Sequence, residues 1–478
     1  MKTKNNTENI SISDMPSMLN TDLYNIRAVE RNWKQDFSEY EVHEMFFRIP
    51  PYKGNNFVMA VGMPYALRYL KCKIDEGDAE WLANQGFSED FIRHLLKQGS
   101  NIFKDVNIWS VEEGTIMLPQ EPIMRIEGPT SAVQLIETYF LSQVGYPTLI
   151  ATKALRCVWA GKQLNNATLL EMGLRRAQTN AGHYGARASY IAGFSITSDA
   201  LAGKIFGIPV SGSSLMHADI QRRESEREAF KSFYEYVSYK DKVTFLIDTY
   251  DIFQGARNAI EVAKEMRENG HELYGVRVDS GDIKEIIPKL RKMFIEAEFP
   301  NVKIMLTGDM NEYKMLELAK QNVYPDFVGV GTELVTGGEK PALGMVYKIK
   351  AVKKDGENIP KIKISADKGK TTVPGPLQVF RTYNKETGLI EKDVIGMYDE
   401  QIEGEPLLKQ VVFNGNIIEE WESSDIDLTK IAKERAQAQI KLLSDEVLSF
   451  EADGSIKIET SDKVKSVTDI LIKKHSSN

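Results

Sequence analysis

The feature of this sequence that most constrains its fold is an alternation of short apolar runs with longer amphipathic segments. The runs are rich in Val and Ile and have the length of buried strands. The segments between them place apolar residues on one helical face, and Pro288 in the second implies a kink or a late start. This order predicts βαβ units and a parallel sheet, either doubly wound or closed into a barrel. The runs are KVTFLID (242–248), LYGVRVD (273–279), VKIMLT (302–307) and DFVGVG (326–331), and the segments are GARNAIEVAKEMREN (255–269), DIKEIIPKLRKMFIEA (282–297) and NEYKMLELAKQN (311–322).

The sequence on either side of this alternation is organised differently. A chain of 478 residues exceeds what one hydrophobic core usually holds, so more than one domain is expected. SAVQLIETYFLSQV has helical spacing, GTIMLPQEPIMRIEG predicts two short strands, and a charged amphipathic helix is expected from about residue 427. Short strands beyond 350 are expected to pack with the N-terminal part as a second unit. The predicted division is a disordered tail over 1–18, an N-terminal part over 19–150, a barrel over 151–350 and a C-terminal part over 351–478.

Composition excludes several classes of function. The formal net charge of −8 provides no basic excess for nucleic acid or an anionic membrane. Two cysteines, Cys72 and Cys157, cannot form a disulfide framework, so a reducing cytoplasm is expected. No apolar run approaches the roughly 18 residues of a membrane span. Clustered Cys and His are also missing, so we expect no structural metal site.

Polar residues follow the ends of four successive predicted strands. Carboxylates, hydroxyls and glycines come directly after each apolar run, at the end where parallel α/β folds bind ligands. Helix capping accounts for such residues as Asp282 and Asp309. It does not account for Arg277, which shares one side of its strand with Asp279. This pair is either a structural ion pair or a site for an anion and a sugar.

Two glycine loops and an arginine pair favour a phosphorylated ligand. The loops TGDMNEY (307–313) and GVGTELVTGG (329–338) allow backbone N–H groups to face an anion. Arg175 and Arg176, with Arg156 and Arg187 nearby in the sequence, are typical of a cationic pocket for diphosphate, although solvated helix faces also carry such residues. His217 in SGSSLMHADI (211–220) follows another short apolar stretch. Alone it resembles an ordinary loop histidine.

Taken together, many stretches resemble the nicotinate phosphoribosyltransferases, in the same order, over roughly residues 18 to 410. The resemblance implies an irregular α/β barrel with a smaller α/β sandwich domain, in a homodimer with shared active sites. It implies that nicotinate and 5-phosphoribosyl 1-diphosphate give nicotinate mononucleotide and diphosphate in NAD salvage, with coupled ATP hydrolysis and Mg²⁺ on the diphosphate. The stretches are LNTDLY, FFRIPP, GLRRAQ, LAGKIFGIPVSG, DTYD, GARNAI, GVRVDSGD, LTGDMNEYK, VGVGTELVTG, PALGMVYKI and KTTVPGPLQVFR.

The resemblance also assigns roles to individual residues. It makes His217 the histidine phosphorylated by ATP, and it places Arg277 and Asp279 at the diphosphate and the ribose hydroxyls. Tyr24 would stack on the pyridine ring from the neighbouring subunit, and Arg175 would line the base and diphosphate region. The remaining predicted substrate-binding residues are Asp199, Ser211, Ser280, Gly308, Asp309, Gly331 and Thr332.

Three positions depart from the family pattern. Met172 stands where an aromatic residue is usual, ITSD (196–199) replaces Gly-Thr-Ser-Asn, and His217 comes six residues after Ser211 instead of five. Asp199 and the longer spacing resemble the nicotinamide phosphoribosyltransferases, in which an aspartate accepts from the carboxamide. Asp199 could equally cap a helix or pair with an arginine.

Three alternatives to the nicotinate enzyme therefore stay open at this point. The first is a nicotinamide phosphoribosyltransferase. The second is a protein that binds phosphoribosyl ligands without turning them over. The third is a metal-dependent barrel enzyme that uses Asp248, Asp251, Asp279 and Asp282.

Overall fold

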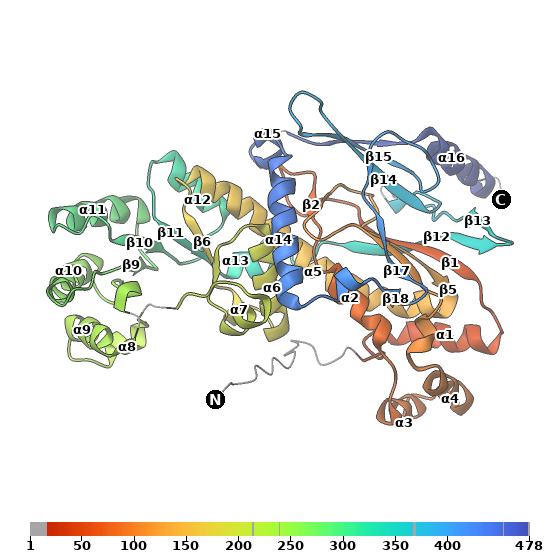
Figure 1. Ribbon diagram of the computed structural model, residues 1–478, viewed down its shortest axis with the longest axis horizontal. Helices are drawn as coiled ribbons and strands as arrows, with labels where there is room; N and C mark the ends of the chain where they lie inside the picture. Colours follow the sequence, from red (N-terminus) through yellow and green to blue (C-terminus); the bar gives the residue numbers. More distant parts are fainter. Residues whose placement is uncertain (1–16, 213–214, 239, 367–369, 453, 477–478) are drawn as a thin grey trace. The chain divides into compact units, whose positions relative to one another are not determined.

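The chain folds into two compact units, both coloured along the sequence in Figure 1. This computed structural model describes residues 17–212, 215–238, 240–366, 370–452 and 454–476. Unit 1 comprises residues 1–152 and 340–478, and unit 2 comprises residues 153–339. One boundary falls inside the long helix α5 (Thr130–Gln163).

Unit 1 joins the two ends of the chain, because its sheets mix N-terminal and C-terminal strands. Among the described residues the largest sheet has seven strands in the order β13-β12-β1-β5-β3-β17-β18. A second sheet has the order β16-β14-β15-β19, and β2 pairs with β4. The strands are β1 (Tyr40–Phe47), β2 (Val58–Met59), β3 (Asn107–Ser110), β4 (Ile116–Met117), β5 (Met124–Pro129), β12 (Met345–Lys354), β13 (Glu357–Pro360), β14 (Leu377–Tyr383), β15 (Ile390–Met397), β16 (Glu405–Pro406), β17 (Lys409–Phe413), β18 (Asn416–Ile417) and β19 (Lys457–Thr460).

Helices cover the sheets of unit 1 and complete its core. Helix α16 contacts β15, and the first half of α5 contributes buried side chains to the main core. Met18 is only 2% exposed and belongs to that core, so it differs from the tail predicted over 1–18, of which residues 1–16 lie outside the described residues. The helices are α1 (Leu23–Lys34), α2 (Met63–Leu67), α3 (Glu76–Asn84), α4 (Glu89–Gln98), α14 (Asp425–Lys441), α15 (Asp445–Leu448) and α16 (Asp462–Ser476).

Unit 2 contains the predicted parallel sheet. Its order in the described part of the chain is β7-β6-β11-β10-β9-β8, and every pairing is parallel. The edge at β7 is extended by a parallel bridge from Thr197 to Val210. The strands are β6 (Thr168–Glu171), β7 (Ile196–Thr197), β8 (Thr244–Leu246), β9 (Gly275–Val278), β10 (Lys303–Leu306) and β11 (Phe327–Val330).

Helices connect consecutive strands of unit 2 by crossovers. Helix α10 packs against α9, α11 and β9, and this group is visible in green in Figure 1. Asp251, Asp282 and Asn311 cap the three connecting helices by accepting backbone N–H groups. The helices are α6 (Thr179–Ala192), α7 (Ala200–Phe206), α8 (His217–Gln221), α9 (Glu226–Tyr236), α10 (Ile252–Glu268), α11 (Ile283–Glu296), α12 (Glu312–Lys320) and α13 (Thr332–Val335).

The expected fold class, a mixed α/β protein with a parallel sheet and a second domain, is confirmed. Strands β8 to β11 coincide with the four apolar runs, and α10 to α12 with the segments between them. Pro288 lies inside α11, so the late start allowed for this helix is wrong. Within the residues that the structure describes, no helix has the length and apolar character needed to span a bilayer.

Candidate active site

The carboxyl ends of β8, β9, β10 and β11 lie next to one another at one edge of the unit 2 sheet, because these neighbouring strands are all parallel. Asp248, Asp279, Gly308 and Gly331 follow the four strands closely. We call these four residues the strand-end cluster. Six predicted site residues stand in the cluster or directly after one of its members, namely Asp279, Ser280, Gly308, Asp309, Gly331 and Thr332.

Asp248 ties the ends of β8 and β9 together. Its Oδ2 accepts from the backbone N–H of Asp279 at 2.8 Å and from Ser280 Oγ at 2.9 Å. Its Oδ1 is buried and has no hydrogen-bond partner in the described part of the chain. Ser280 is therefore held at the site through Asp248, a residue that the sequence suggested only for the metal-dependent alternative.

Arg277 and Asp279 lie on the same side of β9 and its extension, as the alternation predicted. Arg277 Nη2 lies 3.8 Å from Asp279 Oδ2, a long ion pair, with side chains 16% and 33% exposed. Arg277 Nε is buried and unpartnered among the described residues. A partly exposed guanidinium with an unused donor can bind an anion, and the Asp279 carboxylate can accept from hydroxyl groups.

The turn after β10 brings backbone close to β9. Gly308 has φ +91°, and a Cβ there would overlap the carbonyl oxygen of Asp279. Asp309 has φ +48°, and its carbonyl accepts from Lys314 Nζ at 2.7 Å. Only glycine fits at position 308, because both the backbone angle and the space exclude a side chain.

The turn after β11 is shaped by contact with Met172. Gly331 precedes Thr332, the first residue of α13, and a Cβ at Gly331 would lie 3.0 Å from the Met172 carbonyl oxygen. A Cβ at Gly329 would lie 2.5 Å from Met172 Sδ. The Met172 thioether therefore fills the space that Gly329 leaves beside β11, and the Met172 backbone lies next to Gly331. Arg175 follows in the exposed 3₁₀ turn Leu174–Arg176, which contacts α13.

His217 is the first residue of α8 and is half-buried beside the end of β8. Its Nδ1 lies 3.0 Å from Thr249 Oγ1. Ser211 lies beside β7, the strand at the far side of the sheet from β8, where its N–H donates to Thr197 O at 3.0 Å. The two residues 213–214 between them lie outside the described residues.

Asp199 is buried and fully engaged in hydrogen bonds. It caps α7 by accepting from the N–H groups of Leu201 and Ala202 at 3.0 Å, and its Oδ2 lies 2.5 Å from His183 Nδ1. Its own N–H donates to Thr197 Oγ1, which donates to Glu171 Oε2 at 2.6 Å. Burial raises the pKa of Glu171, with a further contribution from the charge of Asp199.

Tyr24 belongs to unit 1, whereas the strand-end cluster belongs to unit 2. It lies in the first turn of α1, is 56% exposed and donates to Glu137 Oε2 at 3.2 Å. Burial and the Glu137 charge raise its pKa. The exposed ring is free to contact another molecule.

Two arginines considered for the cationic pocket have structural partners. Arg156 Nε and Lys153 Nζ share Glu312 Oε1 at 3.0 and 2.9 Å, in a buried group on α5 and α12. Arg187 is 1% exposed, with its guanidinium 5.8 Å from the Phe206 ring. Their charges stabilise unit 2, so Arg156 and Arg187 add little to a solvent-facing pocket.

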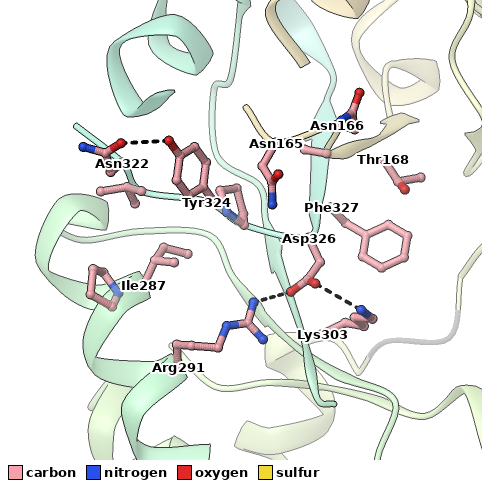
Figure 2. A pocket seen from close by; sticks show the side chains of 14 residues that line it. Asn165, Asn166, Thr168, Ile287, Arg291, Lys303, Asn322, Tyr324, Asp326 and Phe327 are labelled. Carbon is pink, nitrogen blue, oxygen red and sulfur yellow. Dashed lines mark hydrogen bonds and ion pairs between the residues drawn. The ribbon is translucent and has the colours of Figure 1, made fainter. Parts of the chain in front are cut away.

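The opposite edge of the sheet carries a cavity of about 500 Å³, shown in Figure 2. There Asp326 binds Arg291 and, at 3.2 Å, Lys303. Burial raises the pKa of Asp326, but the Ile304 N–H and the Arg291 guanidinium outweigh it and hold the pKa below its usual range. The single Asp326 carboxylate links Arg291 on α11 to Lys303 on β10, which favours a structural role for this edge.

Comparisons with known proteins identify the family to which this chain is similar. The nicotinate phosphoribosyltransferase N-terminal domain matches residues 19–145, and the nicotinate phosphoribosyltransferase family matches residues 167–402. A nicotinate phosphoribosyltransferase of Bacillus subtilis is 40% identical over 396 residues, which cover 82% of this chain and 78% of that protein. One from Mycobacterium tuberculosis is 34% identical, covering 93% and 91%.

A solved structure shares the fold over nearly the whole length. The crystal structure of human nicotinic acid phosphoribosyltransferase superposes with a TM-score of 0.78 at 24% sequence identity, covering 95% of this chain and 99% of that chain. At this identity the likeness concerns the fold alone.

Proposed function

Because this chain belongs to the nicotinate phosphoribosyltransferase family, we propose that it joins nicotinate to 5-phosphoribosyl 1-diphosphate at the strand-end cluster and couples this reaction to ATP through His217. The family's enzymes act in NAD salvage. The relatives are named for nicotinate, which favours nicotinate over nicotinamide as the base. Their enzymatic activity also argues against a protein that only binds phosphoribosyl ligands.

The observation that carries the coupling to ATP is the contact between His217 Nδ1 and Thr249 Oγ1 at 3.0 Å. When Nδ1 carries the proton and donates it to the hydroxyl, Nε2 keeps its lone pair. Nε2 can then attack the γ-phosphorus of ATP, forming a P–N bond while the P–O bond to ADP breaks. Water later cleaves the P–N bond and releases phosphate.

The strand-end cluster suits the transfer of the ribosyl group. When diphosphate leaves C1 of the sugar, positive charge develops on the ribosyl ring while the nitrogen of nicotinate approaches. Arg277, with its unused Nε, can bind the negative charge of the leaving group. The Asp279 carboxylate can accept from the ribose hydroxyls and stabilise the developing cation. The turns at Gly308 and Gly331 leave backbone room for the 5-phosphate.

Residues beside Arg277 and Asp279 also fit a magnesium ion carried in with the diphosphate. Asp248 Oδ1 is a buried carboxylate oxygen without a partner in the part of the chain that the structure describes. Mg²⁺ commonly uses one or two carboxylates together with phosphate oxygens and water. When bound, the ion neutralises charge on the leaving diphosphate. Asp248 would hold it while keeping Ser280 in place.

The exposed Tyr24 ring supports a homodimer in which each subunit supplies an aromatic surface to its partner's site. Tyr24 is held at one end by Glu137, which leaves a face of the ring free to stack on a pyridine. We place the enzyme in the cytoplasm, where its substrates are made and where the thiols of Cys72 and Cys157 stay reduced.

The test measures diphosphate release from the purified protein with 5-phosphoribosyl 1-diphosphate, offering nicotinate or nicotinamide with and without ATP. We expect nicotinate turnover that ATP accelerates. His217→Ala is expected to abolish phosphohistidine formation and the effect of ATP while leaving slow synthesis without ATP. An ATP response that survives in this variant excludes His217 as the phosphoryl acceptor, and turnover of nicotinamide alone contradicts the proposed base.

A further inference from the structure

A buried histidine–aspartate pair, His183 and Asp199, lies where β7 ends, and the mechanism above does not use it. His183 on α6 is 3% exposed and Asp199 is 1% exposed. Their Nδ1 and Oδ2 atoms are 2.5 Å apart, so the His183 ring can donate a hydrogen bond to the carboxylate. So short a contact fixes the orientation of the carboxylate.

The remaining hydrogen bonds of Asp199 are also made with groups inside the protein. Oδ1 accepts from two backbone N–H groups at the start of α7. The Thr197 hydroxyl accepts a hydrogen bond from the backbone N–H of Asp199. It donates to the Glu171 carboxylate at the end of the neighbouring strand β6. His183 is therefore the side chain that occupies Oδ2, the oxygen that the helix cap leaves over.

An aspartate at this edge conflicts with the chemistry of the substrate. Nicotinate is an anion, and a carboxylate with a free oxygen beside it would repel it. The same free oxygen would accept from the N–H group of a carboxamide and would favour nicotinamide. We propose that His183 is a specificity-determining positioning residue, which occupies Asp199 Oδ2 and thereby makes an aspartate here compatible with nicotinate. This inference rests on the proposed place of the base at the carboxyl edge of the sheet.

The test is a double-mutant cycle on the two residues. His183→Leu frees Oδ2 but keeps the helix cap. We expect kcat/KM for nicotinate to fall by about tenfold or more, mainly through KM, while the value for nicotinamide holds or rises. In the Asp199→Asn background, which keeps a good N-cap without the charge, the same histidine change is expected to shift the ratio of the two bases by less than about twofold.

A matched control separates specificity from stability. Ser189→Ala removes another buried hydrogen bond of α6, from Ser189 Oγ to Gly185 O at 2.7 Å. It is expected to lower Tm without changing the ratio of the bases. If His183→Leu does not fold, His183→Gln keeps a donor toward Oδ2, and we expect a smaller change of the ratio in the same direction.

Two outcomes overturn the proposal. One is an equal loss of kcat/KM for nicotinate and for nicotinamide in His183→Leu, which indicates a purely structural role. The other is that His183→Leu shifts the ratio of the two kcat/KM values in the Asp199→Asn background as much as it does with Asp199 present. All ratios are measured with and without ATP, so a failure of coupling through His217 is distinguishable from a failure of base selection.

Discussion

The turn after β10 approaches β9 so closely that one added carbon would disturb both strand ends. Gly308 combines a φ of +91° with contact to the Asp279 carbonyl, a backbone group that cannot rotate away. Displacement of Asp279 would also strain the hydrogen bond that its backbone N–H donates to the Asp248 carboxylate. The geometry of the whole strand-end cluster therefore depends on this glycine.

Gly308→Ala is expected to lower kcat/KM by about a hundredfold, because displacements near 1 Å at a reacting centre have effects of this size. The free energy of unfolding is expected to fall by about 1–3 kcal/mol. Steady-state kinetics and urea unfolding measure the two effects. Gly270→Ala is the control, since Gly270 has φ +79° but nothing within 4 Å of a Cβ. Equal kinetic losses in both variants would contradict the steric argument.

Glu171 gives the stability of unit 2 a pH dependence. Its folded pKa is raised above the ordinary 4.5, mainly by burial, so the folded state holds this proton more tightly than the unfolded state. The resulting stabilisation is complete below pH 4.5 and is lost as pH rises through the raised pKa.

In the Glu171→Gln variant the side chain at this position cannot ionise, so the variant should lack this pH-dependent contribution to stability. We expect the free energy of unfolding of the unsubstituted protein to decline, relative to the variant, between pH 4.5 and neutrality. Urea unfolding of both proteins across this range makes the comparison, and other titrating groups cancel in the difference. Parallel profiles would mean that Glu171 ionises as readily in the folded chain as in the unfolded one.

Helix α11 carries a local defect that its packing tolerates. Pro288 lies in its interior, where it has no backbone N–H to donate a hydrogen bond to a carbonyl of the preceding turn. The helix still begins at Ile283, capped by Asp282, and buries Ile286, Ile287 and Leu290. Apolar burial on one face therefore outweighs the missing hydrogen bond.

Pro288→Ala is expected to raise the free energy of unfolding by about 1–3 kcal/mol, since it restores the bond and removes a ring clash. Thermal unfolding measures the change. Lys289→Ala, which removes the exposed pair with Glu285 and a distant contact with the Phe253 ring, is the control and is expected to stay within about 0.5 kcal/mol. A loss of stability in Pro288→Ala would show that the proline ring contributes packing that outweighs the defect.

Strands β8 to β11 of unit 2 were predictable because they are largely buried and read as continuous apolar runs, whereas β6 and β7 were not predicted. The pairs that shape the site were not. His183 and Asp199 are 16 positions apart, and His217 and Thr249 are 32 apart. Periodicity reports which side of an element is buried, but it does not report which loops meet. Likewise, Arg156 looked like a pocket cation until the structure paired it with Glu312.

At the level of the assembled protein, the proposed homodimer with shared sites predicts complementation. A subunit with Tyr24→Ala lacks the ring that it offers its partner, and one with His217→Ala lacks its own phosphoryl acceptor. In a mixed dimer one of the two sites has both residues. Co-expression of the two variants is expected to restore up to about a quarter of the ATP-coupled activity, because half of randomly formed dimers are mixed. Activity no higher than that of the single variants would contradict sharing.

The order of strands in unit 1 has a consequence for synthesis on the ribosome. The N-terminal strands β1, β5 and β3 occupy the middle of their sheet, with β12 beside β1 and β17 beside β3. Both flanking strands leave the ribosome only after all of unit 2 has been made. The early strands must wait with two unpaired edges, which are open to pairing with other chains. Unit 2, though encoded later, is the first part able to complete its fold, and chaperone protection is needed most during the interval before β12 emerges.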